Sequence, residues 1–294
     1  MLLVIMLSSL YCCSVAQNGL LVFQTDFGLK DGAVAAMKGV AMKVSTDLKI
    51  FDLTHEIPAF NIWEAAYRLQ QTAAYWPAGT VFVSVVDPGV GSERKSVILK
   101  TRSGHYFVTP DNGTLTLIAV SLGTEEVRII DESINRLPGS GKSYTFHGRD
   151  VFAYTGARLA SKKISFQQVG PVMKEKLVMI DYQPPVIENH SIMGNIEVLD
   201  LQYGNVWTNI TDSLLKKINL RYGDSLLVEI YENSIQKFSG VMPFVQTFTG
   251  VPDQHALAYL NSLLNFSFAI NRGSFAGKYS ISSGPEWKVV IQKK

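Results

Sequence analysis

Apolar and polar positions alternate with two different periods along the N-terminal half of the chain. Short apolar runs of strand length are followed by stretches in which apolar residues recur at helical spacing. The expected strands are residues 20–25, 48–57 and 80–86, and the expected helices between them are residues 31–45 and 62–76. This β-α-β-α-β order predicts a parallel sheet with right-handed crossovers, and therefore an α/β fold.

The same patterns continue to about residue 180. Residues 97–101 and 105–110 predict two strands that pair antiparallel, and helices are expected over residues 111–123 and 151–163. We therefore expect an α/β, Rossmann-like N-terminal domain over residues 20–180. It ends in the segment DYQPPVIENH, residues 181–190, in which paired prolines and weak periodicity are typical of a linker.

After the linker the pattern changes to alternation of single apolar and polar residues. This alternation is clear in residues 194–210, 224–231 and 287–292, with turn residues between these segments. It predicts a small β-rich, barrel-like or sandwich domain over residues 191–294. One segment, residues 255–270, has an apolar spacing that predicts a helix within this domain.

The first sixteen residues form a separate segment. Residues 1–16 carry no charged side chain, contain one apolar run too short to span a bilayer, and end in the small-x-small sequence Ser14-Val15-Ala16. They predict a cleaved signal peptide and an exported protein, periplasmic or secreted. No Lys or Arg precedes the apolar run, so a misassigned start codon and a cytoplasmic protein form the alternative. A lipid anchor at Cys12 or Cys13 is a weaker third hypothesis.

Composition narrows the possible functions. Both cysteines lie in residues 1–16, so the mature chain would contain no disulfide, thiolate nucleophile or cysteine zinc site. Hydrophobic residues make up 47% of the 294 residues and charged residues 18%, which is ordinary for a protein with a large core. A net charge of +2 without Lys/Arg runs argues against a nucleic-acid partner.

The most informative stretch is DPGVGSER, residues 87–94, which directly follows the apolar strand 80–86. It places Asp87 at the carboxyl end of a buried strand, with Arg94 seven residues later. In open α/β sheets this edge is where ligands bind. A simple turn or helix-capping role for the acid is the alternative.

Other polar residues could join this edge. Asp26, Asp31 and Asp52 lie at or just after the ends of the first two strands, and His55 follows Asp52. A carboxylate cluster favours either a metal site or recognition of hydroxyl groups, such as the diol of a ribose. His147 stands before a predicted helix in FHGRD, whose Arg149 and Asp150 are expected to form a local ion pair or cap.

In the second domain, GNVWTN places Asn205 and Trp207 on the same side of an extended segment. An amide beside a flat aromatic surface suits a purine or a zwitterion. The alternative is a β-turn followed by a Trp that packs in the core.

Five motifs occur in one order, namely TDFG (25–28), DPGVGSER (87–94), FHGRD (146–150), GNVWTN (204–209) and YLNS (259–262). As a set they resemble the S-adenosylmethionine hydroxide adenosyltransferase family, the adenosine-forming S-adenosylmethionine hydrolases. This family is related to the fluorinating and chlorinating enzymes that act on the same substrate. The resemblance covers about residues 20–291.

The resemblance implies an α/β domain followed by a β-barrel-like domain, and a homotrimer with active sites at subunit interfaces. It implies S-adenosyl-L-methionine as substrate, adenosine and L-methionine as products, and no cofactor or metal. The implied catalytic residues are Asp87, Arg94 and His147. The implied substrate-binding residues are Asp26, Asp31, Phe60, Asp200, Asn205, Trp207, Phe248 and Ser262.

Departures from the halogenating enzymes point to water as the nucleophile. Those enzymes carry Tyr where Asp87 stands, and the fluorinating ones carry Ser and Thr in place of Gly148 and Val90. A carboxylate would repel a halide by about 1–4 kcal/mol at contact distance. Leu263 replaces a family Arg that contacts the substrate. Whether Asp87 or His147 removes the proton from water stays open.

Two other classes of function compete with hydrolysis of S-adenosylmethionine. A metal-dependent phosphatase or nucleotidase would use Asp26, Asp31, Asp52 and His55 as ligands. A nucleoside-binding protein without catalysis would need only a diol-binding acid and a stacking Trp.

Overall fold

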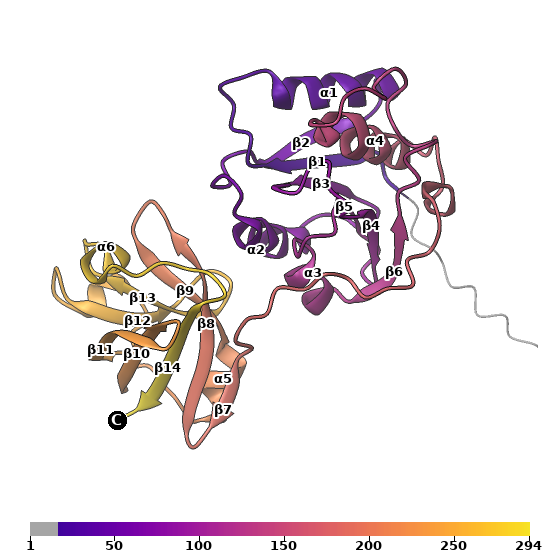
Figure 1. The fold of residues 1–294 in the computed structure, drawn as a ribbon. Coiled ribbons are helices and arrows are strands. Elements are labelled where there is room, and N and C mark those ends of the chain that lie inside the picture. The colour runs from indigo at the N-terminus through magenta and orange to yellow at the C-terminus, as the bar shows by residue number, and fades with distance from the viewer. Residues whose placement is uncertain (1–16) are drawn as a thin grey trace, which may run out of the picture. The chain divides into compact units, whose positions relative to one another are not determined.

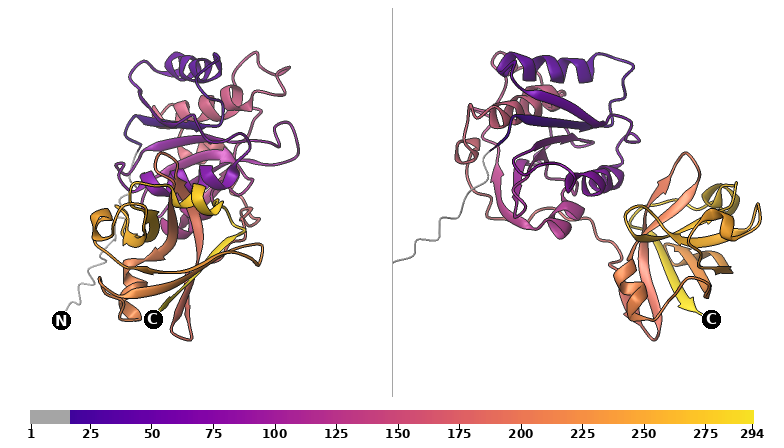
Figure 2. Two further views of the ribbon diagram at one scale, coloured as in Figure 1. Left: turned by 90° about the vertical axis from the view of Figure 1, so that its left-hand side faces the viewer. Right: turned by 180° about the vertical axis from the view of Figure 1, so that it is seen from behind.

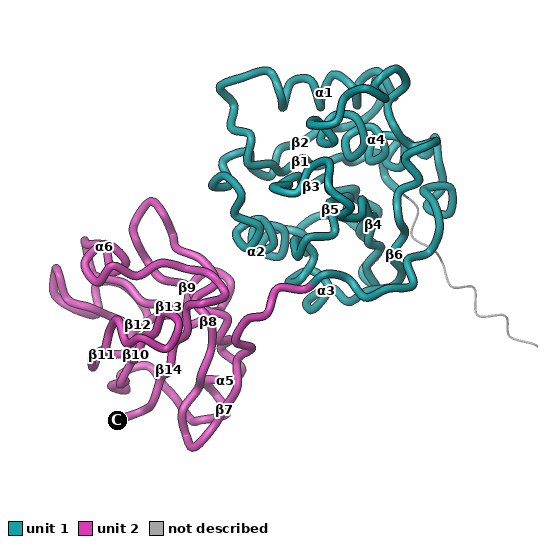
Figure 3. The backbone as a smooth tube through the Cα atoms, viewed as in Figure 1, with its two compact units in different colours: residues 1–178 teal, residues 179–294 magenta. Residues whose placement is uncertain are grey.

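The computed structural model describes residues 17–294, which form two compact units (Figure 1, Figure 3). The chain passes from the first unit to the second between Val178 and Met179. The predicted signal peptide, residues 1–16, lies outside the described residues. Within residues 17–294, no helix has the length and apolar character needed to cross a membrane.

Six strands form the sheet of the first unit, in the order β2-β1-β3-β5-β4-β6. Their bounds are β1 Leu20–Thr25, β2 Lys49–Thr54, β3 Val81–Val85, β4 Ser96–Thr101, β5 Tyr106–Pro110 and β6 Thr124–Ile129. β1 is parallel to β2 and β3, and β3 is parallel to β5, whereas β4 is antiparallel to both β5 and β6. The predicted parallel α/β sheet and its antiparallel pair are therefore confirmed.

Helices cover both faces of this sheet. The α-helices of the described part of this unit are α1 Ala33–Val44, α2 Ile62–Ala73, α3 Thr116–Ser121 and α4 Tyr154–Ala160. Figures 1 and 2 show α1 and α4 on one face and α2 and α3 on the other. Leu21, Phe23 and Val83 pack in one core cluster, whereas Val22 and Phe82 pack in the other. Burial on both faces explains why the central strands β1 and β3 read as apolar runs rather than alternating ones.

The helical segment that follows His147 starts earlier than the predicted 151–163. A π-helical turn, η1 Gly148–Ala153, leads directly into α4. α4 packs closely against the sheet at Gly156, where an added Cβ would lie 2.5 Å from a methyl carbon of Val83. This close packing fixes the helix that carries His147 at its N-terminal end.

The second unit is β-rich, as predicted, and its strands pair antiparallel. Its strands are β7 Val186–Glu188, β8 Ser191–Asp200, β9 Asn205–Thr211, β10 Ser225–Glu232, β11 Ile235–Pro243, β12 Ala256–Leu260, β13 Asn265–Ile270 and β14 Trp287–Lys293. They pair in the order β11-β10-β14-β8-β9-β13-β12, with β7 added to β8. A bridge between Phe244 and Ala258 joins the end of β11 to β12, so the sheet closes nearly into a barrel. The short helices α5 Asp212–Lys217 and α6 Phe275–Tyr279 complete the unit.

The predicted helix over residues 255–270 is wrong, because this segment is the β12–β13 hairpin. The Asn261 side-chain oxygen accepts hydrogen bonds from the N–H groups of Leu263 and Asn265, and Leu264 adopts a φ of 59°. These contacts form a tight turn between the strands. Both faces of the hairpin are covered, so apolar side chains occupy neighbouring positions and imitate helical spacing.

Glu197, on β8, makes the stability of the protein depend on pH. The residue is 4% exposed, and burial raises the pKa of its carboxyl group from 4.5 to about 8. As the pH rises from 4.5 toward 8, the unfolded chain has released a proton that the folded protein still holds. The free energy of unfolding therefore falls across this range.

We expect Glu197→Gln to remove this dependence, because the amide cannot ionise. Relative to the parent, the variant should gain on the order of 4 kcal/mol of stability between about pH 5 and about pH 8. Urea unfolding at the two pH values measures the difference. Equal changes with pH in parent and variant would contradict the burial argument.

Candidate functional site

A carboxylate–guanidinium pair stands at the carboxyl end of β3. Arg94 Nε donates to Asp87 Oδ1 at 2.9 Å, and Arg94 Nη2 donates to the other carboxylate oxygen. The two side chains are only 6% and 11% exposed. Two parallel hydrogen bonds fix the plane of the carboxylate. Arg94 is therefore the partner of Asp87, and the predicted strand-end acid is held inside the protein.

The loop between β3 and β4 returns Arg94 to Asp87. The N–H of Val90 donates to the carbonyl of Asp87, which closes a turn immediately after the strand. Gly91 then adopts a φ of 80°, a conformation that favours glycine. The glycine-rich sequence therefore reverses the chain over a few residues and brings the guanidinium onto the carboxylate.

His147 joins this pair from the segment before η1. Arg94 Nη2 lies 3.1 Å from His147 Nδ1. A guanidinium can only donate, so Nδ1 accepts and the neutral ring carries its proton on Nε2. Burial lowers the pKa of His147. The charges of Glu132 and Asp87 raise this pKa and those of Arg94 and Arg136 lower it, and the net shift stays downward. The ring is therefore neutral at neutral pH.

A cavity of about 260 Å³ opens beside these residues, within the first unit. Its walls include Asp87 and His147, together with the predicted substrate-binding residues Asp26 and Phe60. Asp26 Oδ2 accepts the N–H of Phe60 at 2.9 Å, and Phe60 holds a φ of 68° with its side chain 70% exposed. The cavity therefore brings together Asp87 and His147, a second carboxylate at Asp26 and the exposed ring of Phe60.

Among the substrate-binding residues predicted for this unit, Asp31 does not line the cavity. Its Oδ1 accepts the N–H of Ala33 at 2.8 Å, at the start of α1. Its observed contact is that of a residue that stabilises a helix start, so the structure does not bring it together with the other predicted site residues.

The acids of the metal hypothesis are also engaged elsewhere. Asp52 pairs with Lys38 at 2.6 Å and contacts His55 Nε2 at 3.0 Å, while His55 Nδ1 contacts Thr25 Oγ1. Across residues 17–294, no group of three or more His, Cys, Asp or Glu side chains is arranged to hold a metal ion. The hypothesis that Asp26, Asp31, Asp52 and His55 form a metal site loses its geometric basis.

A second cavity, of about 820 Å³, lies within the second unit. All five substrate-binding residues predicted for this half of the chain line it, namely Asp200, Asn205, Trp207, Phe248 and Ser262. They come from the end of β8, the start of β9, the short helix η3 Phe248–Gly250 and the β12–β13 turn. Loops that are distant in sequence thus converge on one cavity.

The turn between β8 and β9 places two of these residues side by side. Asn205 Nδ2 donates to Asp200 Oδ2 at 3.2 Å. Gly204 precedes Asn205 with a φ of 67°, and a Cβ there would lie 1.9 Å from Ser274 Oγ. Only glycine fits this conformation and this contact, so the glycine of GNVWTN serves to orient the amide that follows it.

An aromatic corner forms another wall of the second cavity. Trp207 Nε1 donates to the Tyr259 hydroxyl at 3.2 Å, and the ring of Phe248 lies 5.0 Å from that of Tyr259. Burial, with a contribution from the charge of Asp200, raises the pKa of Tyr259 to about 12, so the phenol stays protonated. Tyr259 was not among the predicted site residues. Its place in the motif YLNS, three residues before Ser262, was the signal that could have identified it.

Comparisons with known proteins agree with this arrangement. The model of the S-adenosylmethionine hydroxide adenosyltransferase N-terminal domain matches residues 21–170, and that of the C-terminal domain matches residues 194–288. The (R)-S-adenosyl-L-methionine hydrolase of Methanocaldococcus jannaschii is 37% identical over 74% of this chain and 76% of its own length. The enzyme of the same name from Salinispora tropica is 34% identical over 91% of this chain and 96% of its own length.

A solved structure has the same fold. The crystal structure of an uncharacterized conserved protein from Thermotoga maritima superposes with a TM-score of 0.82 and 32% identity. The match covers 92% of this chain and 99% of that protein. Both units are therefore represented in the similarity.

Proposed function

The chain belongs to the S-adenosylmethionine hydroxide adenosyltransferase family, and we propose that it hydrolyses S-adenosyl-L-methionine to adenosine and L-methionine. The observation that carries this proposal is the contact of Arg94 with both Asp87 and His147 at the cavity of the first unit. The cluster supplies what substitution by water at a sulfonium centre requires.

The chemistry of the substrate determines those requirements. A C5′–O bond forms while the C5′–S bond breaks, and the bonding electron pair stays on sulfur. The departing thioether is neutral, so no acid has to protonate it. The site must instead hold one water in line with the C5′–S bond and accept its proton.

Asp87 and His147 offer complementary groups to such a water. The carboxylate accepts a hydrogen bond from the water, and Nε2–H of the neutral imidazole donates one to it. The second lone pair of the water then points toward C5′. Arg94 keeps both groups in place through its two bonds to Asp87 and its contact with His147.

The same hydrogen bonds favour Asp87 over His147 as the proton acceptor. Because Nδ1 accepts from Arg94, Nε2 already carries the ring proton, and the neutral ring has no acceptor atom left for the water. Formation of the C–O bond turns the water into a protonated alcohol, a stronger acid than a carboxylic acid. Even a carboxylate paired with Arg94 can take that proton and pass it to solvent.

The predicted substrate-binding residues that line the two cavities are assigned to parts of the substrate. Asp26 suits the ribose diol, because a carboxylate accepts hydrogen bonds from two hydroxyl groups. Phe60 presents an exposed ring that can cover the sugar or the adenine. In the second unit, the amide of Asn205 and the rings of Trp207 and Phe248 suit the adenine. The carboxylate of Asp200 and the hydroxyl group of Ser262 suit the methionine end.

We also propose a homotrimer in which the first unit of one subunit and the second unit of its neighbour complete each active site. The division of the binding residues supports this proposal, since each of the two cavities lies within a single unit and each holds only part of the predicted set.

Asp87→Asn tests the assignment of the catalytic acid, because it removes the charge and keeps the size. We expect adenosine formation from S-adenosyl-L-methionine, followed by chromatography, to fall by about 10²–10⁴-fold. Asp52→Asn is the matched control. Asp52 also lies near the carboxyl end of a strand of the parallel sheet, β2, but pairs with Lys38 near the surface, so its variant should keep the parent rate within about twofold.

Equal losses in the two variants, or retained turnover in Asp87→Asn, would contradict the assignment. Release of inorganic phosphate from a nucleotide, abolished by a chelator, would instead favour the metal-dependent phosphatase or nucleotidase. Formation of a 5′-chloronucleoside in chloride buffer would contradict the argument that the charge of Asp87 excludes halides.

The names of the relatives suggest which epimer is used. L-methionine fixes the configuration at the α-carbon, so R in their names denotes the sulfonium sulfur. We propose the R epimer as the preferred substrate of this chain. In a mixture of both epimers, chromatography should show the R epimer disappearing first as adenosine appears, whereas equal consumption of both would contradict the preference.

Co-expression of two inactive variants tests the shared site. Asp87→Asn disables the first unit and Asn205→Ala disables the second. In a mixed trimer, a site is intact where the first unit of an Asn205→Ala subunit meets the second unit of an Asp87→Asn subunit. Random mixing makes about a quarter of the sites intact, so about a quarter of the parent activity should be recovered. A mixture of Asp87→Asn with Asp26→Asn is the control, because both changes lie in the first unit and no interface regains an intact pair. Absence of recovery in the first mixture would contradict sites shared between subunits.

A further inference from the structure

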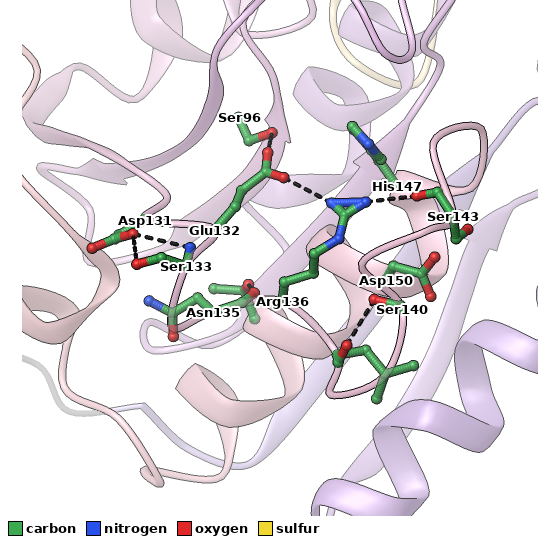
Figure 4. Close-up of polar contacts among 12 residues, drawn as sticks. Ser96, Asp131, Glu132, Ser133, Asn135, Arg136, Ser140, Ser143, His147 and Asp150 are labelled. Atoms are coloured by element: carbon green, nitrogen blue, oxygen red, sulfur yellow. Dashed lines mark hydrogen bonds and ion pairs between the residues drawn. The ribbon is translucent and has the colours of Figure 1, made fainter.

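A second carboxylate–guanidinium pair lies beside the candidate site and has no part in the proposed reaction. Glu132 and Arg136 follow β6, and Arg136 Nη1 donates to Glu132 Oε2 at 2.8 Å. Figure 4 shows the carboxylate of Glu132 between Ser96 and the guanidinium of Arg136. The Glu132 side chain is 35% exposed and that of Arg136 16%, so the pair is partly shielded from water.

Ser96 connects this pair to Arg94. Its hydroxyl accepts from Arg94 Nη1 at 2.9 Å and donates to Glu132 Oε1 at 3.0 Å. Ser96 is the first residue of β4 and only 3% exposed, so the hydroxyl is fixed by the sheet. Glu132 therefore acts on Arg94 through the one terminal nitrogen that does not bind Asp87.

Arg136 connects the pair to the backbone that carries His147. Its Nη2 donates to the carbonyl of Ser143 at 2.7 Å, a contact visible in Figure 4. Ser143 lies four residues before His147, and the residues between them include Thr145 and Phe146 of the cavity wall. One guanidinium thus links Glu132 to the loop that positions the imidazole.

The segment that bears Glu132 and Arg136 is itself anchored in the core. Asn135, between them, is fully buried, and its Nδ2 donates to the carbonyl of Val169 at 2.8 Å. The hydroxyl of Thr155, on α4, donates to the carbonyl of Asn135 at 2.8 Å. The backbone that carries Glu132 and Arg136 is therefore fixed relative to the core, so the two side chains can hold their hydrogen-bond partners in defined positions.

We propose that Glu132 and Arg136 are positioning residues for the reaction, Glu132 orienting Arg94 through Ser96 and Arg136 holding the loop that carries His147. Neither residue touches the substrate in this scheme. The effect on rate rests on the proposed hydrolase function, whereas the effect on His147 is a property of the folded protein alone.

The two charges of the pair act on His147 in opposite directions. Burial is the largest influence and lowers the pKa of His147, Glu132 raises it and Arg136 lowers it. The other charged groups around the ring and its cavity are Asp87, Arg94, Asp26, and Arg149 and Asp150, which pair with each other at 2.7 Å. Protonation of Nδ1 would remove the contact with Arg94, so the pair influences whether the cluster stays assembled.

Glu132→Gln and Arg136→Met test the proposal, with Glu126→Gln as the matched control. Glu126 pairs with Arg128, and its side chain is 35% exposed, like that of Glu132, but it has no link to Arg94. We expect kcat for adenosine formation to fall by about 10–100-fold in both test variants with KM within about threefold. The control should keep the parent values.

The titration of His147 gives the second readout. NMR of labelled imidazoles, with His147→Gln to assign the signal, should show the pKa of His147 lower in Glu132→Gln and higher in Arg136→Met than in the parent. Ser96→Ala combined with Glu132→Gln should be no slower than the slower single variant, because both changes break one connection.

A purely structural role predicts equal losses of thermal stability and no opposed movement of the His147 pKa, and that result would overturn the proposal. Unchanged kcat in both test variants would overturn it as well. If the parent protein shows no hydrolysis, the proposed function fails, while opposed titrations of His147 still support the action of the pair on the ring.

Discussion

The contact between Arg94 and Asp87 is the interaction on which the first cavity depends. Both charged side chains are largely buried, so removing one of them leaves the other without a partner. Such a change typically lowers the free energy of unfolding by about 3–5 kcal/mol. The guanidinium also reaches His147 and Ser96, so a single side chain joins the end of β3, the start of β4 and the segment before η1. Three elements are thereby held in one geometry by planar, directional hydrogen bonds.

Much of the fold and part of the site could be predicted because their signals are local. Strand ends, glycine turns and helical spacing lie within a few residues of one another, and they placed Asp87, Arg94 and the α/β order correctly. The resemblance of the ordered motifs then identified residues that the second cavity gathers, including Asn205 and Trp207. A motif is informative here because its glycine, at position 204, is required by its positive φ and by the close approach of Ser274.

The rest depends on contacts between residues distant in sequence. His147 contacts Arg94 although 53 positions separate the two residues in the sequence, and no spacing rule predicts such a contact. The β12–β13 hairpin was missed because burial on both faces hides the alternation of strands, and the loss of that alternation also hid Tyr259. Asp31 accepts a hydrogen bond at the start of α1, and residue type alone does not separate such a helix-start contact from a ligand contact.

The tautomer of His147 has a consequence for how this position can vary among proteins. The ring offers an acceptor to a guanidinium and a donor on its far edge, and a side-chain amide offers the same two groups in the same plane. Glutamine or asparagine is therefore a chemically permitted replacement during evolution. Asp87 has no such substitute, because no neutral side chain presents two acceptors to a guanidinium and a third lone pair to water.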